Sequence, residues 1–378
     1  MKVVVLGAGL VGKAVALDLA ADGKFHVSAV DLKKETLDDL RNKGLTSVEQ
    51  RDLSRPDEVK RAVKSFDLVI NAVPGFLGFG TLKACLEAGK NVIDIAFSPE
   101  DPFELDGLCK RKGITAVVDC GVAPGLSNIL AGHALTRMDK GESLVIYVGG
   151  LPVVRKWPFE YKTVFSPSDV IEEYLRPARF KENGEMIIRP ALSDPELVEF
   201  EGVGTLEAFN SDGLRTLLKT LPIPNMKEKT LRYPGHREKM AILKEAGLFD
   251  TQPLNINGKE ITPRDITAEV LFSRLKLQPG EEDLTIMRVV ITGKKSDHPL
   301  TLTYDLCDRF DQKAGFHSMA RTTGFTAAMA ARAFGLGMIK NLGITPPEFL
   351  GFDPECYHFI LSGLEERGVR VKENMDSR

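Results

Sequence analysis

The stretch MKVVVLGAGLVGKAVALDLAADGKFHVSAVD, residues 1–31, decides the fold. Its apolar run Val3–Leu6 predicts a buried parallel strand, and GAGLVG (7–12) follows at once and fits the pattern GxGxxG. A second predicted strand, Phe25–Val30, ends at Asp31. Between the glycines and that strand, apolar residues recur at helical spacing: Val11, Val15 and Leu19. The stretch therefore predicts a strand, a tight glycine turn, a helix and a second strand closed by an acid.

Each glycine of this turn has a mechanical reason. Gly7 permits the tight turn, Gly9 lets the backbone approach a pyrophosphate, and Gly12 lets the helix pack closely on the strand. The helix N-terminus offers free N–H groups and positive partial charge to phosphates. Asp31 lies where an acid accepts hydrogen bonds from both ribose hydroxyls of NAD, and its charge repels the 2′-phosphate of NADP. We therefore expect NAD as cofactor, a preference that Lys33–Lys34 close by would soften.

Length and composition limit the class of protein. A chain of 378 residues is too long for one ordinary core, so we expect two domains. The net charge of −3 gives no reason to expect nucleic acid or an anionic membrane as partner, and no apolar run approaches the roughly 20 residues of a membrane span. The chain enters a strand directly after Met1, which leaves no room for a signal peptide. Its five cysteines are scattered without a CxxC pair, which favours reduced thiols in a cytoplasm and argues against a zinc site.

The next hundred residues alternate strands with helices. Ser54 is the expected N-cap of one helix, with Asp57 as its capping-box partner. This alternation predicts a doubly wound parallel sheet of six strands, an α/β fold. The further strands are expected at 46–51, 66–73, 91–96 and 114–119, and the further helices at 33–42, 81–88 and 103–112.

Ligands of such a sheet bind at the carboxyl ends of its strands. Those ends nominate a set of cofactor contacts, although structural capping is an equal alternative for Asp52. The predicted cofactor-binding residues are Gly7, Gly9, Leu10, Val11, Gly12, Asp31, Asp52, Leu53, Asn71, Ala72, Val73 and Pro74.

The pattern changes after Gly125. The chain is therefore divided into a dinucleotide-binding domain over 1–125, an α+β domain with a mixed sheet over 126–316, and a C-terminal segment of helices over 317–378. The helix predicted over 317–337 is almost all Ala, Gly, Met and Phe, so we expect it to return and pack on the first domain, together with a helix over 357–368. In the second domain, strands are expected at 143–152, 159–165, 184–190, 198–204, 205–210, 285–292 and 300–306, and helices at 169–174, 214–220 and 237–246.

Several strings in this order resemble the saccharopine dehydrogenase-like family over nearly the whole chain. They are DCGVAPGLSNILAG (119–132), IYVGGLP (146–152), EYKTVFSPSDVIEEY (160–174), LEAFNSDGLRTL (206–217), TLRYPGH (230–236) and MARTTGFTAA (319–328). The resemblance is strongest to members that oxidise L-lysine with NAD at its ε-carbon. It implies a Rossmann domain, a substrate domain with a mixed sheet, a homodimer made through that second domain, and release of ammonia with 2-aminoadipate semialdehyde, which cyclises to a piperideine carboxylate. PGFLGFG (74–80) is a departure from the pattern that bears on the substrate.

Oxidising an amine by hydride transfer requires a neutral amine, whose pKa in solution is about 10.4, so the site must remove a proton. Asp94 and Asp119, at strand ends, are the first candidates to hold the amine or relay its proton. The alternative is that each carboxylate binds backbone N–H groups of its own loop. Cys120 is expected to be a small buried residue rather than a nucleophile.

Five residues beyond the first domain are candidates for substrate or catalysis. Arg215 offers a guanidinium for the substrate α-carboxylate, with a surface salt bridge as the alternative. His236, in the turn that also presents Tyr233, is a candidate general base, although such a histidine is more often a packing residue. Tyr161 would wall the aliphatic stem of the substrate or pack in the core. Arg321 would contact phosphate or substrate, or form an interdomain ion pair.

Two other functions compete with lysine oxidation. Saccharopine carries three carboxylates, so its site would need several convergent cations, and five arginines are available: Arg176, Arg179, Arg215, Arg232 and Arg237. A nucleotide-binding sensor without turnover would bind NADH and show no amine-dependent signal.

Overall fold

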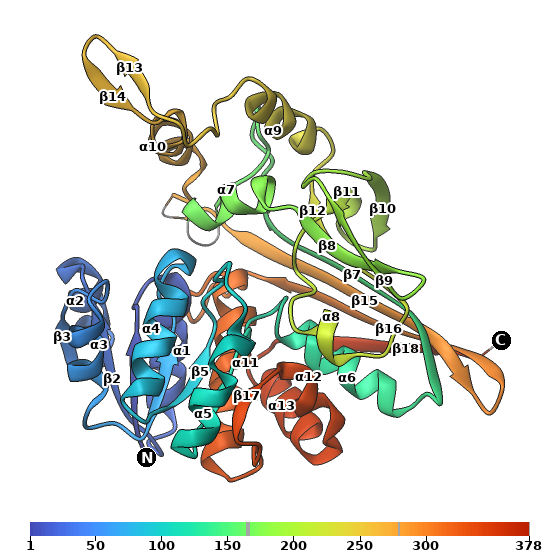
Figure 1. Cartoon of the computed structure of the whole chain (residues 1–378), viewed down its shortest axis with the longest axis horizontal. Helices are drawn as coiled ribbons and strands as arrows, with labels where there is room; N and C mark the ends of the chain where they lie inside the picture. Colours follow the sequence, from blue (N-terminus) through green and yellow to red (C-terminus); the bar gives the residue numbers. More distant parts are fainter. Residues whose placement is uncertain (164–166, 279, 378) are drawn as a thin grey trace. The chain divides into compact units, whose positions relative to one another are not determined.

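The computed structural model describes residues 1–163, 167–278 and 280–377, with the side chains of 167–169 and 272 left undescribed. The chain divides into two compact units, drawn in Figure 1. Unit 1 comprises Met1–Arg137 and Ala320–Val371, and unit 2 comprises Met138–Met319 and Lys372–Arg378. None of the helices in the described part of the chain is both long and apolar enough to span a membrane.

Unit 1 contains a seven-stranded sheet in which neighbouring strands of the described residues pair in parallel. The order is β17-β6-β5-β4-β1-β2-β3, so the winding reverses between β4 and β1, where α/β sheets bind their ligands. The strands are β1 (Lys2–Leu6), β2 (His26–Asp31), β3 (Val48–Gln50), β4 (Leu68–Asn71), β5 (Asn91–Asp94), β6 (Thr115–Val117) and β17 (Gly343–Thr345). The helices between them are α1 (Leu10–Ala21), α2 (Lys34–Asn42), α3 (Pro56–Val63), α4 (Gly75–Glu87), the 3₁₀ turn η1 (Pro102–Leu105) and α5 (Asp106–Lys112).

The predicted doubly wound sheet is confirmed, with local differences. The apolar run of β1 is completely buried from Val3 to Leu6, as expected for a central parallel strand. The capping box at Ser54 is wrong: α3 begins after Arg55 without a side-chain cap, and Ser54 bonds to Asp52 instead. Helix α4 begins at Gly75 rather than at 81, because Pro74 presets the backbone for a helix start, so most of PGFLGFG is helical.

The chain returns to unit 1 near its C-terminus and supplies a seventh strand, β17, which the sequence analysis missed. Unit 1 also contains α6 (Leu126–Thr136), so it extends to 137 rather than to the predicted 125. Close backbone approach explains this: a Cβ at Gly132 would lie 2.2 Å from the Glu348 carbonyl oxygen, and the Asn128 side chain donates to Glu348 at 3.0 Å. Glu348 lies on α12 (Pro347–Phe352).

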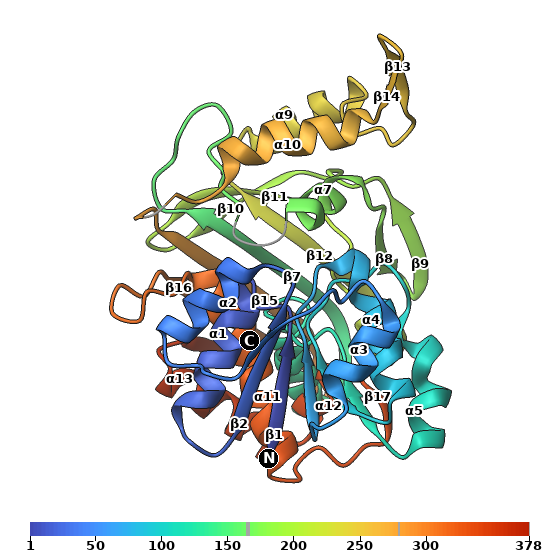
Figure 2. The same ribbon diagram turned by 90° about the vertical axis from the view of Figure 1, so that its left-hand side faces the viewer.

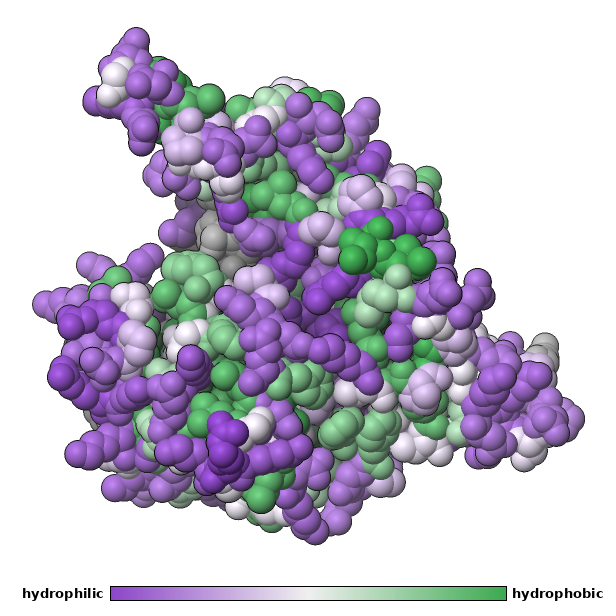
Figure 3. Space-filling view, viewed as in Figure 1, coloured by the Kyte–Doolittle hydropathy of each residue, from purple (hydrophilic) through white to green (hydrophobic). Residues whose placement is uncertain are grey.

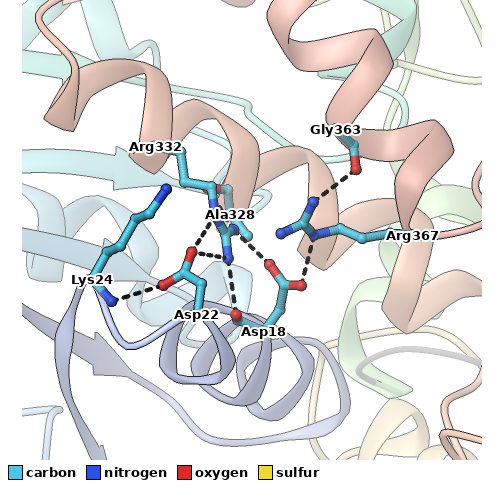
Figure 4. A network of polar contacts seen from close by, with 7 residues as sticks. All are labelled: Asp18, Asp22, Lys24, Ala328, Arg332, Gly363 and Arg367. Atoms are coloured by element: carbon cyan, nitrogen blue, oxygen red, sulfur yellow. Dashed lines mark hydrogen bonds and ion pairs between the residues drawn. The ribbon is translucent and has the colours of Figure 1, made fainter.

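One ion-pair network around Asp18 binds the returning helices to α1, as Figure 4 shows. Arg332, on α11 (Ser318–Gly335), donates to Asp18 at 2.6 Å and to Asp22 at 3.0 Å. Arg367, the residue after α13 (Pro354–Glu366), donates to the other oxygen of Asp18 at 2.7 Å. The predicted return of the C-terminal helices to the first domain is therefore confirmed.

The mixed sheet predicted for the second domain is confirmed in unit 2, where it has nine strands. Strand β12 pairs with β7 in parallel, whereas β15 pairs antiparallel with both β7 and β16. The strands are β7 (Lys140–Pro152), β8 (Ala178–Glu182), β9 (Glu185–Arg189), β10 (Glu196–Phe200), β11 (Gly204–Asn210), β12 (Asn225–Arg232), β15 (Asp283–Lys295), β16 (His298–Arg309) and β18 (Val371–Asp376). The helices are α7 (Pro167–Leu175), α8 (Leu217–Thr220), α9 (His236–Glu245) and α10 (Pro263–Leu275).

Several expectations for unit 2 need correction. The strand predicted over 159–165 is not formed over 159–163, and its remaining residues lie outside the described ones. The strand predicted over 198–204 ends at Phe200, because the glycines at 202 and 204 adopt positive φ and turn the chain. Strands β8, β12 and β18 were not anticipated. A separate hairpin, β13 (Leu254–Ile256) with β14 (Lys259–Ile261), extends beyond α10 in Figures 1 and 2.

Candidate active site

The glycine turn of unit 1 has the geometry of a phosphate cradle. Gly7 adopts φ +87°, and a Cβ there would lie 2.5 Å from the Ala72 carbonyl oxygen, so the end of β4 closes on the turn. A Cβ at Gly12 would lie 1.9 Å from the Gly7 carbonyl oxygen. By contrast, no heavy atom of the described residues lies within 4 Å of a Cβ built on Gly9, the N-cap of α1. Packing requires two of the glycines, and the third leaves space for a ligand.

The acid at the end of β2 is held beside this turn. Asp31 accepts hydrogen bonds from the backbone N–H of Ala8 at 2.7 Å and of Lys33 at 2.8 Å, one to each oxygen. These contacts aim the carboxylate into the space beside the cradle. Leu10, 40% exposed at the start of α1, borders the same turn together with Val11. The residues therefore fit a dinucleotide, with phosphates at Gly9 and a ribose at Asp31.

Other predicted cofactor contacts have structural partners. Asn71 is completely buried and donates to the Gly78 carbonyl oxygen and to Asp94, so its side chain fastens α4 and β5. Asp52 accepts hydrogen bonds from both the N–H and the hydroxyl of Ser54, which lowers its pKa, and Leu53 is buried in the core. Asp52 thus stabilises the turn that precedes α3, and Asn71 holds α4 and β5 together.

The end of β4 also contributes backbone and apolar surface to the cradle. Ala72 donates its N–H to the Leu6 carbonyl oxygen at 2.8 Å, Val73 is 5% exposed, and Pro74 is the N-cap of α4. This segment lies against the glycine turn at the reversal of the winding.

Two buried carboxylates lie at the strand ends beyond β4. Asp94 is 4% exposed and accepts hydrogen bonds from Asn71 at 2.9 Å and from the Ala96 N–H at 3.0 Å. Asp119, which follows β6, is 3% exposed and adopts φ +51°, a conformation that aspartate tolerates better than most residues. Burial raises the pKa of the adjacent Cys120 thiol well above its usual range, which agrees with a small buried residue. The strand ends therefore place both acids on the ligand-binding edge of the sheet.

Unit 2 gathers guanidinium groups around one carboxylate. Arg179 donates from Nε and Nη2 to the two oxygens of Asp212, each at 2.8 Å. Arg215, 9% exposed, follows on the same loop at φ +49°. Burial, and then the positive charge of Arg215, lower the pKa of Arg176, which places this third guanidinium nearby. Three arginines around one aspartate make a cationic site suited to a carboxylate.

A buried acid supports the loop that carries these groups. Glu228, on β12, accepts hydrogen bonds from the Ser211 hydroxyl at 2.7 Å and from the Gly213 N–H at 3.0 Å. A Cβ at Gly213 would lie 2.4 Å from the Glu228 carboxyl carbon, so a side chain there would displace the Glu228 carboxyl group. Burial raises the pKa of Glu228 to about 8. Sequence reasoning missed Glu228, because the strand β12 that carries it was not predicted.

His236 is a packing residue in this structure, which corrects its assignment as a general base. The ring is 1% exposed, and its Nδ1 and Nε2 bond to the Phe159 carbonyl and the Tyr174 hydroxyl at 2.8 and 2.9 Å. Burial, with the charge of Arg232, lowers the pKa of His236 to about 3. Both ring nitrogens are thus occupied, and the neutral ring has none to offer a substrate.

The two predicted substrate tyrosines are also buried. The Tyr161 ring lies under the Arg232 guanidinium, 4.5 Å from its centroid, and Arg232 is paired with Glu173 at 2.6 Å. The Tyr233 hydroxyl donates to the Pro152 carbonyl oxygen at 3.0 Å. Both rings are at most 5% exposed, so they follow the core-packing alternative.

Arg321 lies within unit 1, where its Nη2 donates to the Arg367 carbonyl oxygen at 2.8 Å. The side chain is 5% exposed. This contact caps the last turn of α13 and explains the arginine without a substrate. Among the described residues, no group of three or more His, Cys, Asp or Glu side chains is arranged to hold a metal ion.

Comparisons with known proteins agree with this geometry. The family model for the saccharopine dehydrogenase NADP binding domain matches residues 3–117, and that for the saccharopine dehydrogenase C-terminal domain matches residues 121–369. Bovine alpha-aminoadipic semialdehyde synthase is 25% identical over 97% of this chain, which spans 47% of that protein's length. The chain thus spans about half the length of the first curated relatives that it matches.

Relatives of similar length are also found. Carboxynorspermidine synthase of Vibrio cholerae is 23% identical over 94% of this chain and 93% of its own. A solved apo saccharopine dehydrogenase (L-Glu forming) from Saccharomyces cerevisiae superimposes with a TM-score of 0.80, at 20% identity and 99% coverage of both chains, which shows a shared fold. Because the two family models together cover almost the entire chain, this protein belongs to the saccharopine dehydrogenase family.

Proposed function

We propose that this protein is an NAD-dependent lysine 6-dehydrogenase. It would convert L-lysine, NAD⁺ and water to 2-aminoadipate 6-semialdehyde, ammonia and NADH, and the semialdehyde would then cyclise to piperideine-6-carboxylate. The observation that carries the choice of lysine is the state of the arginines in unit 2. Two of the five candidates are held by acids outside the cluster around Asp212: Arg232 by Glu173 and Arg237 by Glu207.

These pairs bear directly on substrate charge. Arg232 is 2% exposed and lies against Tyr161, so no substrate carboxylate can reach it without unfolding the core. Arg237 is bound to Glu207 at 3.1 Å and to the Leu192 carbonyl oxygen at 3.2 Å. A site for three carboxylates would need more cations than this arrangement offers, whereas the single α-carboxylate of lysine suits Arg215 and its neighbours.

The chain's own residues would bind the substrate and handle its proton. In unit 2, Arg215 is the candidate to bind the α-carboxylate. Asp119, with Asp94 as the other candidate, would take the proton that the ε-ammonium group must lose before oxidation. The bound nicotinamide supplies the hydride acceptor. Water would then attack the carbon of the resulting imine and release ammonia.

The proposal of NAD rests on Asp31. Its carboxylate lies at the end of β2 beside the glycine turn, where it would accept hydrogen bonds from the ribose hydroxyls and repel a 2′-phosphate. This preference for NAD differs from the name of the matching domain family, which refers to NADP.

A substrate panel tests the function. The purified chain is assayed for absorbance of the reduced nicotinamide with lysine, saccharopine, ornithine and 2,4-diaminobutyrate, each with NAD and with NADP. We expect the highest kcat/KM with lysine and NAD, and a loss of about 100-fold or more in Arg215→Ala, mainly in KM. Absence of turnover with lysine would contradict the proposal.

Saccharopine oxidation is the second candidate, because the matching domains and several relatives carry the name of saccharopine dehydrogenase. The same panel distinguishes the two. Turnover with saccharopine that exceeds turnover with lysine would assign the substrate to this alternative.

We also propose a homodimer formed through unit 2. Apolar side chains reach the surface of Figure 3 beside the β13–β14 hairpin, and the hairpin itself exposes two more. A two-stranded hairpin is marginally stable without a packing partner. The exposed residues are Ile242, Leu254, Ile256, Ile266 and Val270. Light scattering should give twice the chain mass of 41.6 kDa, and a monomer at micromolar concentration would contradict this arrangement.

A further inference from the structure

Arg51 lies on the ligand-binding edge of unit 1, next to the ribose acid. It directly follows β3, and its backbone N–H donates to the Asp31 carbonyl oxygen at 3.0 Å. Asp31 and Gln50 are partners in the β2–β3 register. Asp31 and Arg51 therefore come from the carboxyl ends of neighbouring parallel strands, where an acid selects NAD and an arginine accommodates the 2′-phosphate of NADP.

The Arg51 guanidinium is held by two carboxylates. Its Nη2 donates to Glu49 on β3, and its Nη1 donates to Glu58 on α3. These contacts raise the pKa of Arg51, chiefly through the hydrogen bond to Glu49. The Nε of Arg51 is buried and has no hydrogen-bond partner among the described residues. The side chain is 21% exposed, so it is partly accessible, and each of its terminal nitrogens already donates to a carboxylate.

The charges around this guanidinium disfavour a phosphate. A phosphate monoester carries about −1.5 to −2 charges at neutral pH and binds best to a guanidinium that presents two parallel N–H donors. Here two carboxylates, Glu49 and Glu58, already bond to one arginine. Arg61 bonds to Glu58 at 2.5 Å but is 68% exposed, and Lys33–Lys34 are exposed as well.

We propose that Arg51 is a latent ligand for a 2′-phosphate and that Glu49 and Glu58 keep it from that role. The two glutamates together with Asp31 then determine the choice of cofactor. This inference rests on the proposed preference for NAD. It explains how a chain whose domain family is described as binding NADP keeps a suitably placed arginine and still favours NAD.

The test measures binding, so it does not depend on the amine substrate. The full-length protein is titrated with NADH and with NADPH, and the fluorescence of the bound reduced nicotinamide gives each Kd. Four variants are compared with the parent: Glu58→Gln, the double variant E49Q/E58Q, the triple variant E49Q/R51A/E58Q, and Glu87→Gln. Glu87 is an acid of α4 paired with Lys60, so it controls for the loss of a negative charge elsewhere in unit 1.

The parent should bind NADH more tightly than NADPH. In E49Q/E58Q the Kd for NADPH should fall about tenfold or more while that for NADH changes less than about threefold, and Glu58→Gln should show a smaller shift of the same sign. The triple variant should lose the gain, and Glu87→Gln should show none.

An unchanged Kd for NADPH in E49Q/E58Q with intact NADH binding, a gain that persists without Arg51, or tighter NADPH binding by the parent would each overturn the inference. If the double variant fails to bind NADH at all, Glu58→Gln decides alone. Failure of lysine turnover, with these binding results intact, would contradict only the proposed substrate.

Discussion

At the scale of single residues, two buried groups of unit 2 are held neutral for different purposes. Burial and Arg232 lower the pKa of His236 to about 3, and both ring nitrogens bond within the unit. Burial raises the pKa of Glu228 to about 8, with the charges of Glu173 and Asp212 adding to the effect. The histidine completes the packing around Tyr174, whereas the glutamate supports the loop of Asp212 and Arg215.

The pKa of Glu228 predicts a pH-dependent contribution to stability. The folded protein keeps the Glu228 proton up to pH about 8, and the unfolded chain releases it above its ordinary value of 4.5. A rise in pH across this window therefore lowers the free energy of unfolding, by about 5 kcal/mol in all. Glu228→Gln should remove this decline, since the amide does not titrate.

Chemical denaturation of both proteins at pH 5, 6.5 and 8 measures this effect. The difference between them isolates Glu228, because His236 contributes with opposite sign, below about pH 6.5, in both proteins. Glu245→Gln, an exposed position on α9, is the control. Parallel pH curves for the parent and Glu228→Gln would contradict the assignment.

At the scale of elements, the three glycines of the turn between β1 and α1 have different roles: two are needed for packing, and one leaves space for a ligand. Gly7 and Gly12 are required by backbone oxygens within 2.5 Å of their missing Cβ atoms. Gly9 has an ordinary φ of −63° and open space instead. Strand, turn and helix would therefore form even with alanine at Gly9, whereas a ligand's phosphates would meet the added methyl group.

The two alanine variants should consequently fail in different ways. Gly12→Ala should lose about 2–4 kcal/mol of stability, because its Cβ would collide with the Gly7 carbonyl oxygen. Gly9→Ala should retain stability within about 1 kcal/mol and bind NADH about tenfold or more weakly. Thermal melts and NADH titrations measure both, and equal effects of the two substitutions on stability would contradict this division.

At the scale of the whole molecule, unit 1 is built from both ends of the chain. Residues 320–371 add α11, α12, α13 and β17 to the sheet begun at residue 2. Hydrophilic side chains cover α2 and α3 in Figure 3, whereas the returning helix α11 is bound to α1 by Arg332 with only 9% of its side chain exposed. Completing unit 1 thus requires residues 320–371, which follow most of unit 2 in the sequence.

Removing this connection should destabilise unit 1. Arg332→Ala leaves Asp18 and Asp22 without their shared partner, and we expect a loss of about 3 kcal/mol. Lys60→Ala breaks an ion pair whose side chains are 39% and 37% exposed, so it should cost less than about 1 kcal/mol. Calorimetry measures both, and an equal cost for the two substitutions would show that the network around Asp18 contributes little.

Among the candidate site residues, those of the dinucleotide turn in unit 1 were predictable from the sequence. GAGLVG and Asp31 are local in sequence, and their spacing already contains the turn, the helix start and the acid. The cluster of charged groups in unit 2 was less predictable. Arg179, Asp212 and Glu228 meet only through the pairing of β11 with β12 and of β8 with β12. His236 was predicted as an accessible histidine in a turn. In the structure it is buried, and its two ring nitrogens are hydrogen-bonded to Tyr174 and Phe159.

The sequence by itself determined the parallel α/β sheet, the dinucleotide cradle and the return of an Ala-rich helix, because each depends on periodicity or on contacts within one stretch. Only the tertiary structure decided which charged groups are accessible. Arg232, Arg237 and Arg332 each pair with an acid of their own unit, brought close by strand pairing or helix packing rather than by spacing along the chain. Residues 1–31 therefore specify the dinucleotide-binding edge of the parallel sheet. The acid that folding brings to each arginine determines whether its guanidinium is held inside the protein.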